Sequence, residues 1–282
     1  MNKLRNFDLR RATLWIGVAI VGMAVFVAVF APLLAPHDPY VQNLNQRMVP
    51  PVWFDGGSFT HVLGTDQLGR DYLSRLIYGA RVSLMIGSLT VVLSGTIGIT
   101  LGMLGGYFGG KVDTAVMFII TCRLSVPLIL VALTVVALIG NSLPVLVLTL
   151  GLLLWERFAV VARSTTMQEQ RREYVDAARA AGASLPFIMV REVLPNILPH
   201  LVVVATLEVA IAILLEASLS FLGLGVPAPL PSWGLMIAEA RDFMFFTPWV
   251  IGVPGTALAT LVLAINLLGD GLRDFAGGKL RP

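Results

Sequence analysis

Long apolar runs alternate with polar segments along this 282-residue chain. A bilayer-spanning α-helix needs about 20 apolar residues. Runs of this kind cover residues 12–36, 82–110, a stretch ending near 140, and then 143–162, 201–222 and 249–268. Hydrophobic residues make up 56% of the chain and charged residues 13%, which is far from the composition of a soluble domain. The pattern predicts an all-α integral membrane protein with six transmembrane helices.

The basic residues predict an orientation for these spans. Residues 1–11 hold Lys3, Arg5, Arg10 and Arg11 ahead of the first apolar run. We interpret this run as an uncleaved transmembrane helix with its basic end in the cytoplasm; the alternative is a cleaved signal peptide. Thirteen of the 20 Lys and Arg residues then fall in cytoplasmic segments and five in outer segments, which favours both termini inside.

The longest polar segment of the second half of the chain is the loop 163–199. An alanine-rich stretch with helix-forming composition ends there at Gly182, and glycine readily adopts the left-handed conformation that terminates helices. Ser184 is placed to cap a second helix with Pro186 in its first turn, and Pro195 and Pro199 are expected to break that helix. We therefore expect a short helix-turn-helix outside the bilayer that another protein contacts.

This loop resembles the EAA loop of the membrane subunits of bacterial ABC importers. The resemblance lies in Asp176-Ala177-Ala178, then Gly182 after three intervening residues, and then Leu194-Pro195, with Asp176 in place of the usual Glu. The wider text EYVDAARAAGAS at 173–184 is similar to the C-type subunits of the dipeptide/oligopeptide/nickel permease family. The resemblance implies a set of residues that couple the chain to an ATPase: Glu173, Tyr174, Asp176, Ala177, Ala178, Gly182 and Ala183.

A second motif lies in the polar, outer segment 37–81. It resembles the family signature GTD-x-LGRD-x-x-SR and includes Gly64, Thr65, Asp66, Gly69, Arg70 and Asp71. Asp71 and Arg75 are four residues apart, which supports an ion pair if a helix begins near Asp71. We interpret the motif as a structural turn and cap. A catalytic role for Asp66 and Asp71 is the alternative, although no nucleophile or base accompanies them.

Glycine recurs at every fourth position from Gly98 to Gly110. Small residues at this spacing allow two helix backbones to approach closely in lipid, so we expect a packing seam against another span or a partner subunit. The segment Gly105–Lys111 matches most of a phosphate-binding loop, but Val112 stands where Ser or Thr would hold magnesium. We therefore expect no ATP site in this chain.

Arg123, Glu208 and Glu216 are charged residues deep inside apolar runs, whereas Glu156 and Arg157 lie near the inner end of the run 143–162. Charged groups at membrane depth face protein or a water-filled path rather than lipid. For Arg123 we favour snorkelling or pairing over lining the transport pathway. Glu208 and Glu216 lie eight residues apart, about 80° around a helix, and both an intersubunit contact and a pathway role remain open.

The remaining polar features suggest membrane anchoring but no metal site. The segment 235–246 is amphipathic and is expected at the membrane interface, with Trp233 and Trp249 as anchors. His37, His61 and His200 show no metal-ligand spacing, and the single cysteine, Cys122, rules out an intrachain disulfide.

The family resemblance runs from Ala35 to Asp274 and implies a type I ABC importer permease in the bacterial inner membrane. It implies an N-terminal region at 1–80, a five-helix transporter domain at 81–274 with the coupling loop 163–199, and a cytoplasmic tail at 275–282. The implied partners are a second homologous permease, two ABC ATPases that carry ATP and magnesium, and a periplasmic substrate-binding protein, within a lipid bilayer and without nucleic acid. This chain itself is expected to bind no cofactor and to be no enzyme.

Several alternatives stay open on the sequence. Di- or oligopeptides are the default substrate, and nickel, opines, glutathione and short sugars are others. A secondary transporter would need ion-coupling residues and often repeats, an intramembrane enzyme would need a paired catalytic set, and a membrane scaffold would not need the loop at 163–199. Copurification of an ATPase pair separates the importer from all three.

Overall fold

The computed structural model describes residues 2–278, and the side chains of residues 13–274. Helices make up nearly all of its regular structure, and within the described residues the only β-type pairing is two isolated bridges in the segment 58–71. The elements are α1 (Asn2–Val29), α2 (Ala31–Leu34), η1 (Leu44–Gln46), α3 (Tyr72–Phe108), α4 (Gly110–Leu124), α5 (Leu128–Ile139), α6 (Leu143–Leu153), α7 (Glu156–Glu169), α8 (Glu173–Ala180), α9 (Leu185–Phe187), η2 (Ile188–Val193), α10 (Leu194–Phe221), α11 (Trp233–Ala240), η3 (Arg241–Phe243) and α12 (Trp249–Gly278).

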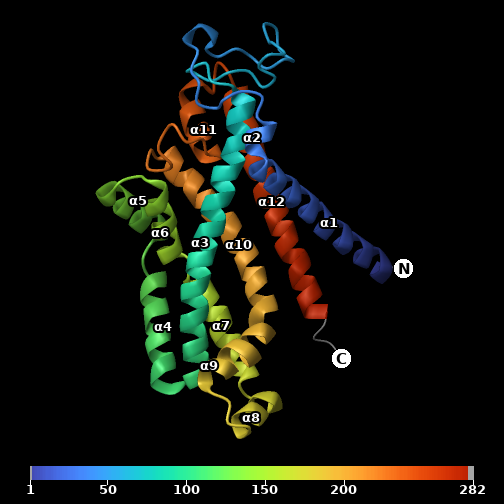
Figure 1. The fold of residues 1–282 in the computed structure, drawn as a ribbon, viewed down its shortest axis with the longest axis vertical. Helices are drawn as coiled ribbons and strands as arrows, with labels where there is room; N and C mark the ends of the chain where they lie inside the picture. Colours follow the sequence, from blue (N-terminus) through green and yellow to red (C-terminus); the bar gives the residue numbers. More distant parts are fainter. Residues whose placement is uncertain (1, 279–282) are drawn as a thin grey trace.

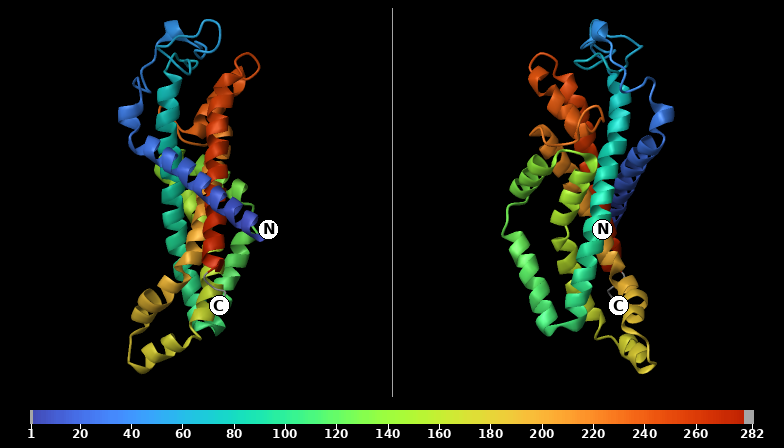
Figure 2. Two further views of the ribbon diagram at one scale, coloured as in Figure 1. Left: turned by 90° about the vertical axis from the view of Figure 1, so that its right-hand side faces the viewer. Right: turned by 60° about the vertical axis from the view of Figure 1, so that its left-hand side comes forward.

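The helices form an elongated bundle around α3, the central helix (Figure 1). The loop between α2 and α3 caps one end of the bundle, and α8 lies at the opposite end. Helix α1 crosses the bundle at a steep angle and packs against α12 and α3 (Figure 2). The tail expected at 275–282 lies partly outside the described residues, since α12 continues to Gly278.

By length and composition, the described helices supply four or five of the six expected spans. Four helices are each long and apolar enough to cross a membrane, namely Tyr72–Phe108, Leu143–Glu169, Leu185–Phe221 and Trp249–Asp274. The bent pair α4 and α5 supplies a fifth if it is one span. The first expected span corresponds to α1, whose apolar part Thr13–Val29 is a shorter helix.

The third expected span is broken rather than straight. Helices α4 and α5 meet at an angle of 79°. The residue before a proline is disfavoured in helical conformation, and a proline lacks the N–H that would continue the ladder. Pro127 accordingly stands as the N-cap of α5 instead of inside a continuous helix.

The expectation that Pro195 and Pro199 end the second loop helix is wrong. Residues Leu185–Phe221 form one helical run, in which η2 is a π-helical turn immediately before Pro195. Within it the N–H of Leu194 bonds to the carbonyl of Met189, five residues back instead of four. A wider turn makes room for a proline ring that would otherwise clash with the preceding turn, and Pro199 is accommodated inside α10.

The expected glycine seam is confirmed, and it joins two helices of the same chain. A Cβ on Gly102 would lie 2.8 Å from the Cβ of Ala162, and one on Gly106 would lie 2.5 Å from the carbonyl oxygen of Arg163. Gly98 meets the start of α7 in the same way. Helices α3 and α7 therefore touch at backbone distance, whereas Gly110 lies beyond the seam in open space.

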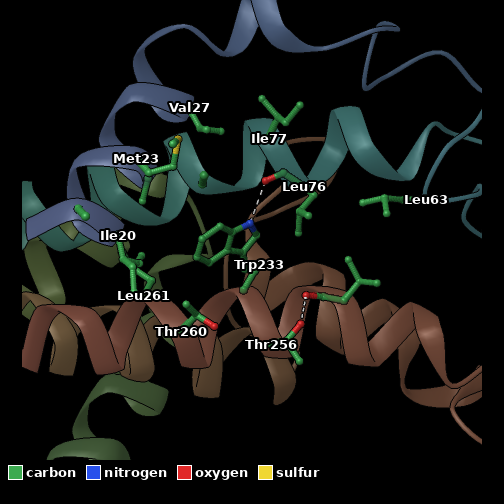
Figure 3. A pocket seen from close by; sticks show the side chains of 15 residues that line it. Ile20, Met23, Val27, Leu63, Leu76, Ile77, Trp233, Thr256, Thr260 and Leu261 are labelled. Carbon is green, nitrogen blue, oxygen red and sulfur yellow. Dashed lines mark hydrogen bonds between the residues drawn. The ribbon is translucent and has the colours of Figure 1, made fainter. Parts of the chain in front are cut away.

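Trp233 is not the interfacial anchor that the sequence suggests. Its ring is buried, with 6% of the residue exposed, and its indole N–H donates to the carbonyl of Leu76 at 2.9 Å. Figure 3 shows this ring closing one side of an apolar groove between α1, α3 and α12, with a volume of about 740 Å³. Trp249 instead packs edge-on against Tyr72, with ring centroids 5.4 Å apart.

Candidate functional site

Helix α8 is held to the end of the bundle by two inward-facing residues. Val175 is fully buried. The phenol of Tyr174 donates to Glu169 at 2.9 Å and accepts from the side-chain amide of Asn196 at 3.3 Å. Burial, followed by the bond to Glu169, raises the pKa of Tyr174 to about 12, so the phenol stays neutral. Tyr174 thereby joins α8 to the end of α7 and the start of α10.

The expected stop of α8 at Gly182 is confirmed in detail. Gly182 has φ +79°. The N–H of Ala183 bonds to the carbonyl of Ala178, and the N–H of Gly182 bonds to that of Arg179, both at 3.0 Å. This pair of bonds defines the Schellman motif, which needs a left-handed residue at the position of Gly182. Ser184 takes the N-cap position of α9, but its side chain makes no cap hydrogen bond.

The other face of α8 points away from the bundle. Glu173, Asp176 and Ala177 are exposed, while Ala178 and Ala183 are partly buried against the core below. Arg179 reaches from α8 to the end of α3, where its Nε lies 3.2 Å from the hydroxyl of Tyr107 and its guanidinium lies over the ring. The seven residues that the sequence predicts for ATPase coupling therefore lie close together at this end of the bundle. Some of them hold α8 in place, and the others form its outer surface.

The outer motif forms a buried network of charges at the opposite end. Arg70 donates to Asp66 at 2.6 Å and to Glu239 of α11 at 3.1 Å. Arg75 bonds to the same two carboxylates. The side chains of Asp66, Arg70 and Arg75 are all at most 3% exposed. The motif therefore ties the loop and the start of α3 to α11.

The expected ion pair between Asp71 and Arg75 does not form. Asp71 is the N-cap of α3, and its carboxylate accepts from the backbone N–H of Ser74 at 2.8 Å. A capping side chain folds back over the first turn, so it points away from the residue four positions ahead. Gly64 and Gly69 shape the turns of this loop with positive φ, and the Thr65 hydroxyl donates to the carbonyl of Gln46.

The three charged residues at membrane depth all have partners inside the chain. Arg123 lies 3.9 Å from Glu156 and also bonds to the carbonyl of Leu153, which fits the pairing favoured for it. Glu208 is fully buried and lies 3.3 Å from Arg157, beside a cavity of about 260 Å³. Glu216 is also fully buried and accepts from the hydroxyls of Ser220 at 2.7 Å and Ser232 at 2.8 Å.

Comparison with known proteins decides the family. Residues 98–282, well over half of the chain, match the family described as "Binding-protein-dependent transport system inner membrane component". The chain belongs to this family. Residues 9–51 also match the N-terminal transmembrane domain of oligopeptide transport permease C.

Relatives of this inner membrane component cover nearly the whole chain. It is 39% identical to the dipeptide transport system permease protein DppC of Haemophilus influenzae, over 94% of this chain and 90% of that protein. It is 43% identical to the di/tripeptide transport system permease protein DppC of Pseudomonas aeruginosa, over 94% of this chain and 88% of that protein. It is 42% identical to the dipeptide transport system permease protein DppC of Escherichia coli K12, over 94% of this chain and 89% of that protein. The chain is thus an ABC importer permease subunit.

A solved structure shares the fold of this inner membrane component. The MetNI methionine ABC transporter in an inward-facing conformation aligns with a TM-score of 0.57 at 20% identity, over 73% of this chain and 97% of that chain.

The segment Gly105–Lys111, which resembles a phosphate-binding loop, runs from the end of α3 into α4 and so lies between two helices.

The sequence did not predict a role for two residues that form ion pairs in the structure. Glu239 completes the outer charge network from more than 160 residues away, and no local pattern marks it. Arg157 pairs with Glu208 across α7 and α10. Its position near the inner end of an apolar run is the sequence feature that indicates this pairing, since a charged residue at membrane depth is expected to have a partner.

Proposed function

We propose that this inner membrane component carries di- or short oligopeptides into the cytoplasm as one half of a permease pair. The named relatives transport dipeptides or di- and tripeptides, and they match this chain along almost its whole length. A periplasmic binding protein delivers the peptide, a second related permease completes the pathway, and both termini lie in the cytoplasm. Of the charged residues inside the spans, we assign Glu208, which is buried beside a cavity, to the lining of that pathway.

The outer surface of α8 is the observation that carries the coupling part of the proposal. This helix projects from the end of the bundle, and it is supported from beneath by Val175 and Tyr174. A short, firmly held helix with an exposed polar face suits contact with a cytoplasmic partner. We assign that contact to an ABC ATPase, which supplies the ATP and magnesium sites, so this chain works as a permease without catalysis.

The coupling contact is tested by reversing charge on α8. The side chain of Asp176 is 67% exposed, and its ion pair with Arg179 at 3.0 Å lies on the surface, where such pairs contribute little, so we expect Asp176→Arg to leave the fold intact. Asp242→Arg is the matched control, because Asp242 is 77% exposed and lies at the opposite end. We expect Asp176→Arg to reduce ATPase copurification and peptide-stimulated ATP hydrolysis, and Asp242→Arg to leave copurification unchanged. Equal copurification by both variants would overturn the assignment.

The substrate is tested separately by uptake. Complexes reconstituted in liposomes with the binding protein are supplied with labelled dipeptide, and unlabelled peptides, nickel and short sugars compete. We expect competition from di- and tripeptides alone. Competition by nickel or a sugar in place of peptides would transfer the proposal to that substrate class.

A further inference from the structure

Two histidines and an aspartate meet where the chain returns to the start of α3. His37 follows α2, His61 lies in the outer loop, and Asp71 caps α3. The Nδ1 atom of His61 lies 2.8 Å from Oδ1 of Asp71, and Nδ1 of His37 lies 3.6 Å from the same oxygen. One ligand atom from each residue falls within 4.8 Å of the others. No spacing pattern marks this cluster in the sequence, because its members are 10 to 34 residues apart and a loop brings them together.

The hydrogen bonds around His61 determine which of its ring nitrogens carries a proton. The side-chain oxygen of Asn43 accepts from the N–H of Asn45 at 3.2 Å, which leaves the Asn43 amide nitrogen to donate to Oε1 of Gln46 at 3.0 Å. That same Gln46 oxygen faces Nε2 of His61 at 3.3 Å. Because a carbonyl oxygen only accepts, Nε2 of His61 is the protonated nitrogen.

The Asp71 oxygen 2.8 Å from Nδ1 of His61 also only accepts, so without a metal ion His61 needs a proton on each ring nitrogen and is a cation. A neutral His61 protonated at Nε2 instead presents a lone pair from Nδ1 toward this carboxylate. His37 turns its own Nδ1 toward the same oxygen. Lone pairs that converge in this way need a positive charge between them, either a proton on an imidazole or a metal ion. A metal ion satisfies all three ligand atoms at once, whereas a proton joins only two.

We propose that His37, His61 and Asp71 bind one divalent transition-metal ion of the zinc type. Two imidazole nitrogens and one carboxylate oxygen are a common ligand set for zinc, with bonds of about 2.0–2.2 Å. The ligand atoms of such a site lie about 3.3 Å apart, and the two observed distances to Asp71, 2.8 and 3.6 Å, fall on either side of that value. Histidine nitrogens favour zinc over magnesium and calcium, which prefer oxygen ligands.

The surroundings of the cluster fit a metal site. A zinc-bound histidine usually donates its other ring N–H to an oxygen, and Gln46 supplies that oxygen for His61. Asp71 is oriented by the N–H of Ser74, which bonds to its second oxygen at 2.8 Å. The side chains of His61 and Asp71 are 10% and 2% exposed, while that of His37 is 38% exposed and leaves an entry path. The ion would fasten the segment after α2 and the outer loop to the start of α3.

The test measures zinc binding to the full-length chain, purified without a polyhistidine tag and stripped of metal. His37→Ala is the main variant, because the backbone N–H of residue 37, which bonds to Ser74, is retained. Asp71→Asn removes the ligand charge, while asparagine still caps a helix well. His200→Ala is the matched control, since His200 is the third histidine of the chain and lies in α10.

We expect the wild type and His200→Ala to bind one zinc ion per chain. Loss of an outer-shell partner typically lowers metal affinity about 10–100-fold, so loss of a ligand in His37→Ala should exceed that range. Gln46→Ala should fall within it. Zinc should raise the unfolding temperature of the wild type and not of His37→Ala, and X-ray absorption should report two imidazoles on the ion. No zinc binding by the wild type, or equal binding by His37→Ala, would overturn the proposal in favour of a proton.

Discussion

Arg75, in the first turn of α3, donates to Glu239 of α11 at 2.9 Å, although 164 residues separate them in the sequence. Arg70 approaches the same carboxylate from the loop, and Asp66 closes the network from the other side. Two arginines and two carboxylates thus balance one another in a site from which water is largely excluded. Charges in this setting are costly to leave unpaired.

Removal of Glu239 should therefore destabilise the outer end of the molecule. In Glu239→Ala, two buried guanidinium groups keep Asp66 as their only carboxylate, and breaking such a pair costs about 3–5 kcal/mol. We expect a clearly lower unfolding temperature in detergent. Asp242→Ala is the control, because its pairing with Arg241 is largely exposed and should contribute little. Equal losses in the two variants would contradict the role given to the network.

Substitution in the glycine seam should separate α3 from α7. A side chain at Gly102 has no free space, since even a Cβ would press on Ala159 and Ala162. Overpacking of this kind costs about 1–3 kcal/mol, so Gly102→Leu should lower yield and assembly with the partner permease.

The control for the seam is Gly252→Leu in α12. A Cβ at Gly252 meets nothing within 4 Å, so the helix accommodates the substitution. Both variants are compared by thermal unfolding and by the fraction that copurifies with the second permease. Unchanged assembly of Gly102→Leu would show that the two helices separate without consequence.

Substitution of Gly182 should uncouple the transporter without unfolding it. No atoms crowd this position, so the cost comes only from its left-handed backbone, at about 1–3 kcal/mol for a β-branched residue. Gly182→Val should reach normal membrane levels and lose both peptide uptake and ATP hydrolysis stimulated by the loaded binding protein. Gly182→Asn should retain both, because asparagine tolerates the left-handed conformation. Wild-type transport by Gly182→Val would disprove coupling through this turn.

Cysteine labelling should place the two ends of the bundle on opposite sides of the membrane. The native Cys122 is exposed and is first replaced by serine. In that background, Phe59→Cys should react with a membrane-impermeant thiol reagent in spheroplasts, because Phe59 is 88% exposed in the outer loop. Gln168→Cys, near the end of α7, should react only after lysis. The reverse pattern would invert the proposed orientation.

Local chemistry explains which features the sequence predicted well. Gly182 ends a helix because of its own backbone freedom, and the glycines of α3 mark a close contact wherever they recur on one face. The prediction failed where two local rules competed. Asp71 both caps α3 and lies four residues before Arg75, and the backbone N–H of Ser74 holds its side chain in the capping position.

Long-range packing explains what the sequence did not show. Trp233 resembles an interfacial anchor in isolation, but α3 lies close enough for its indole to bond to Leu76. Proline usually ends a helix, yet the π-helical turn before Pro195 lets α10 continue. The cluster of His37, His61 and Asp71 depends on the fold of the outer loop, and the contact of Glu239 with Arg75 depends on the packing of α11, neither of which a periodic pattern encodes.

The length and contacts of α3 make it a strut between the two ends of the molecule. Its 37 residues extend over about 55 Å at 1.5 Å per residue. Its first turn is fastened to α11 by Arg75, and Tyr107 near its last turn touches Arg179 of α8. The seam with α7 stiffens the inner half of α3. We therefore expect a displacement of α8 to move the outer loop as well. The break at Pro127 acts as a hinge, so that α5 does not follow this movement.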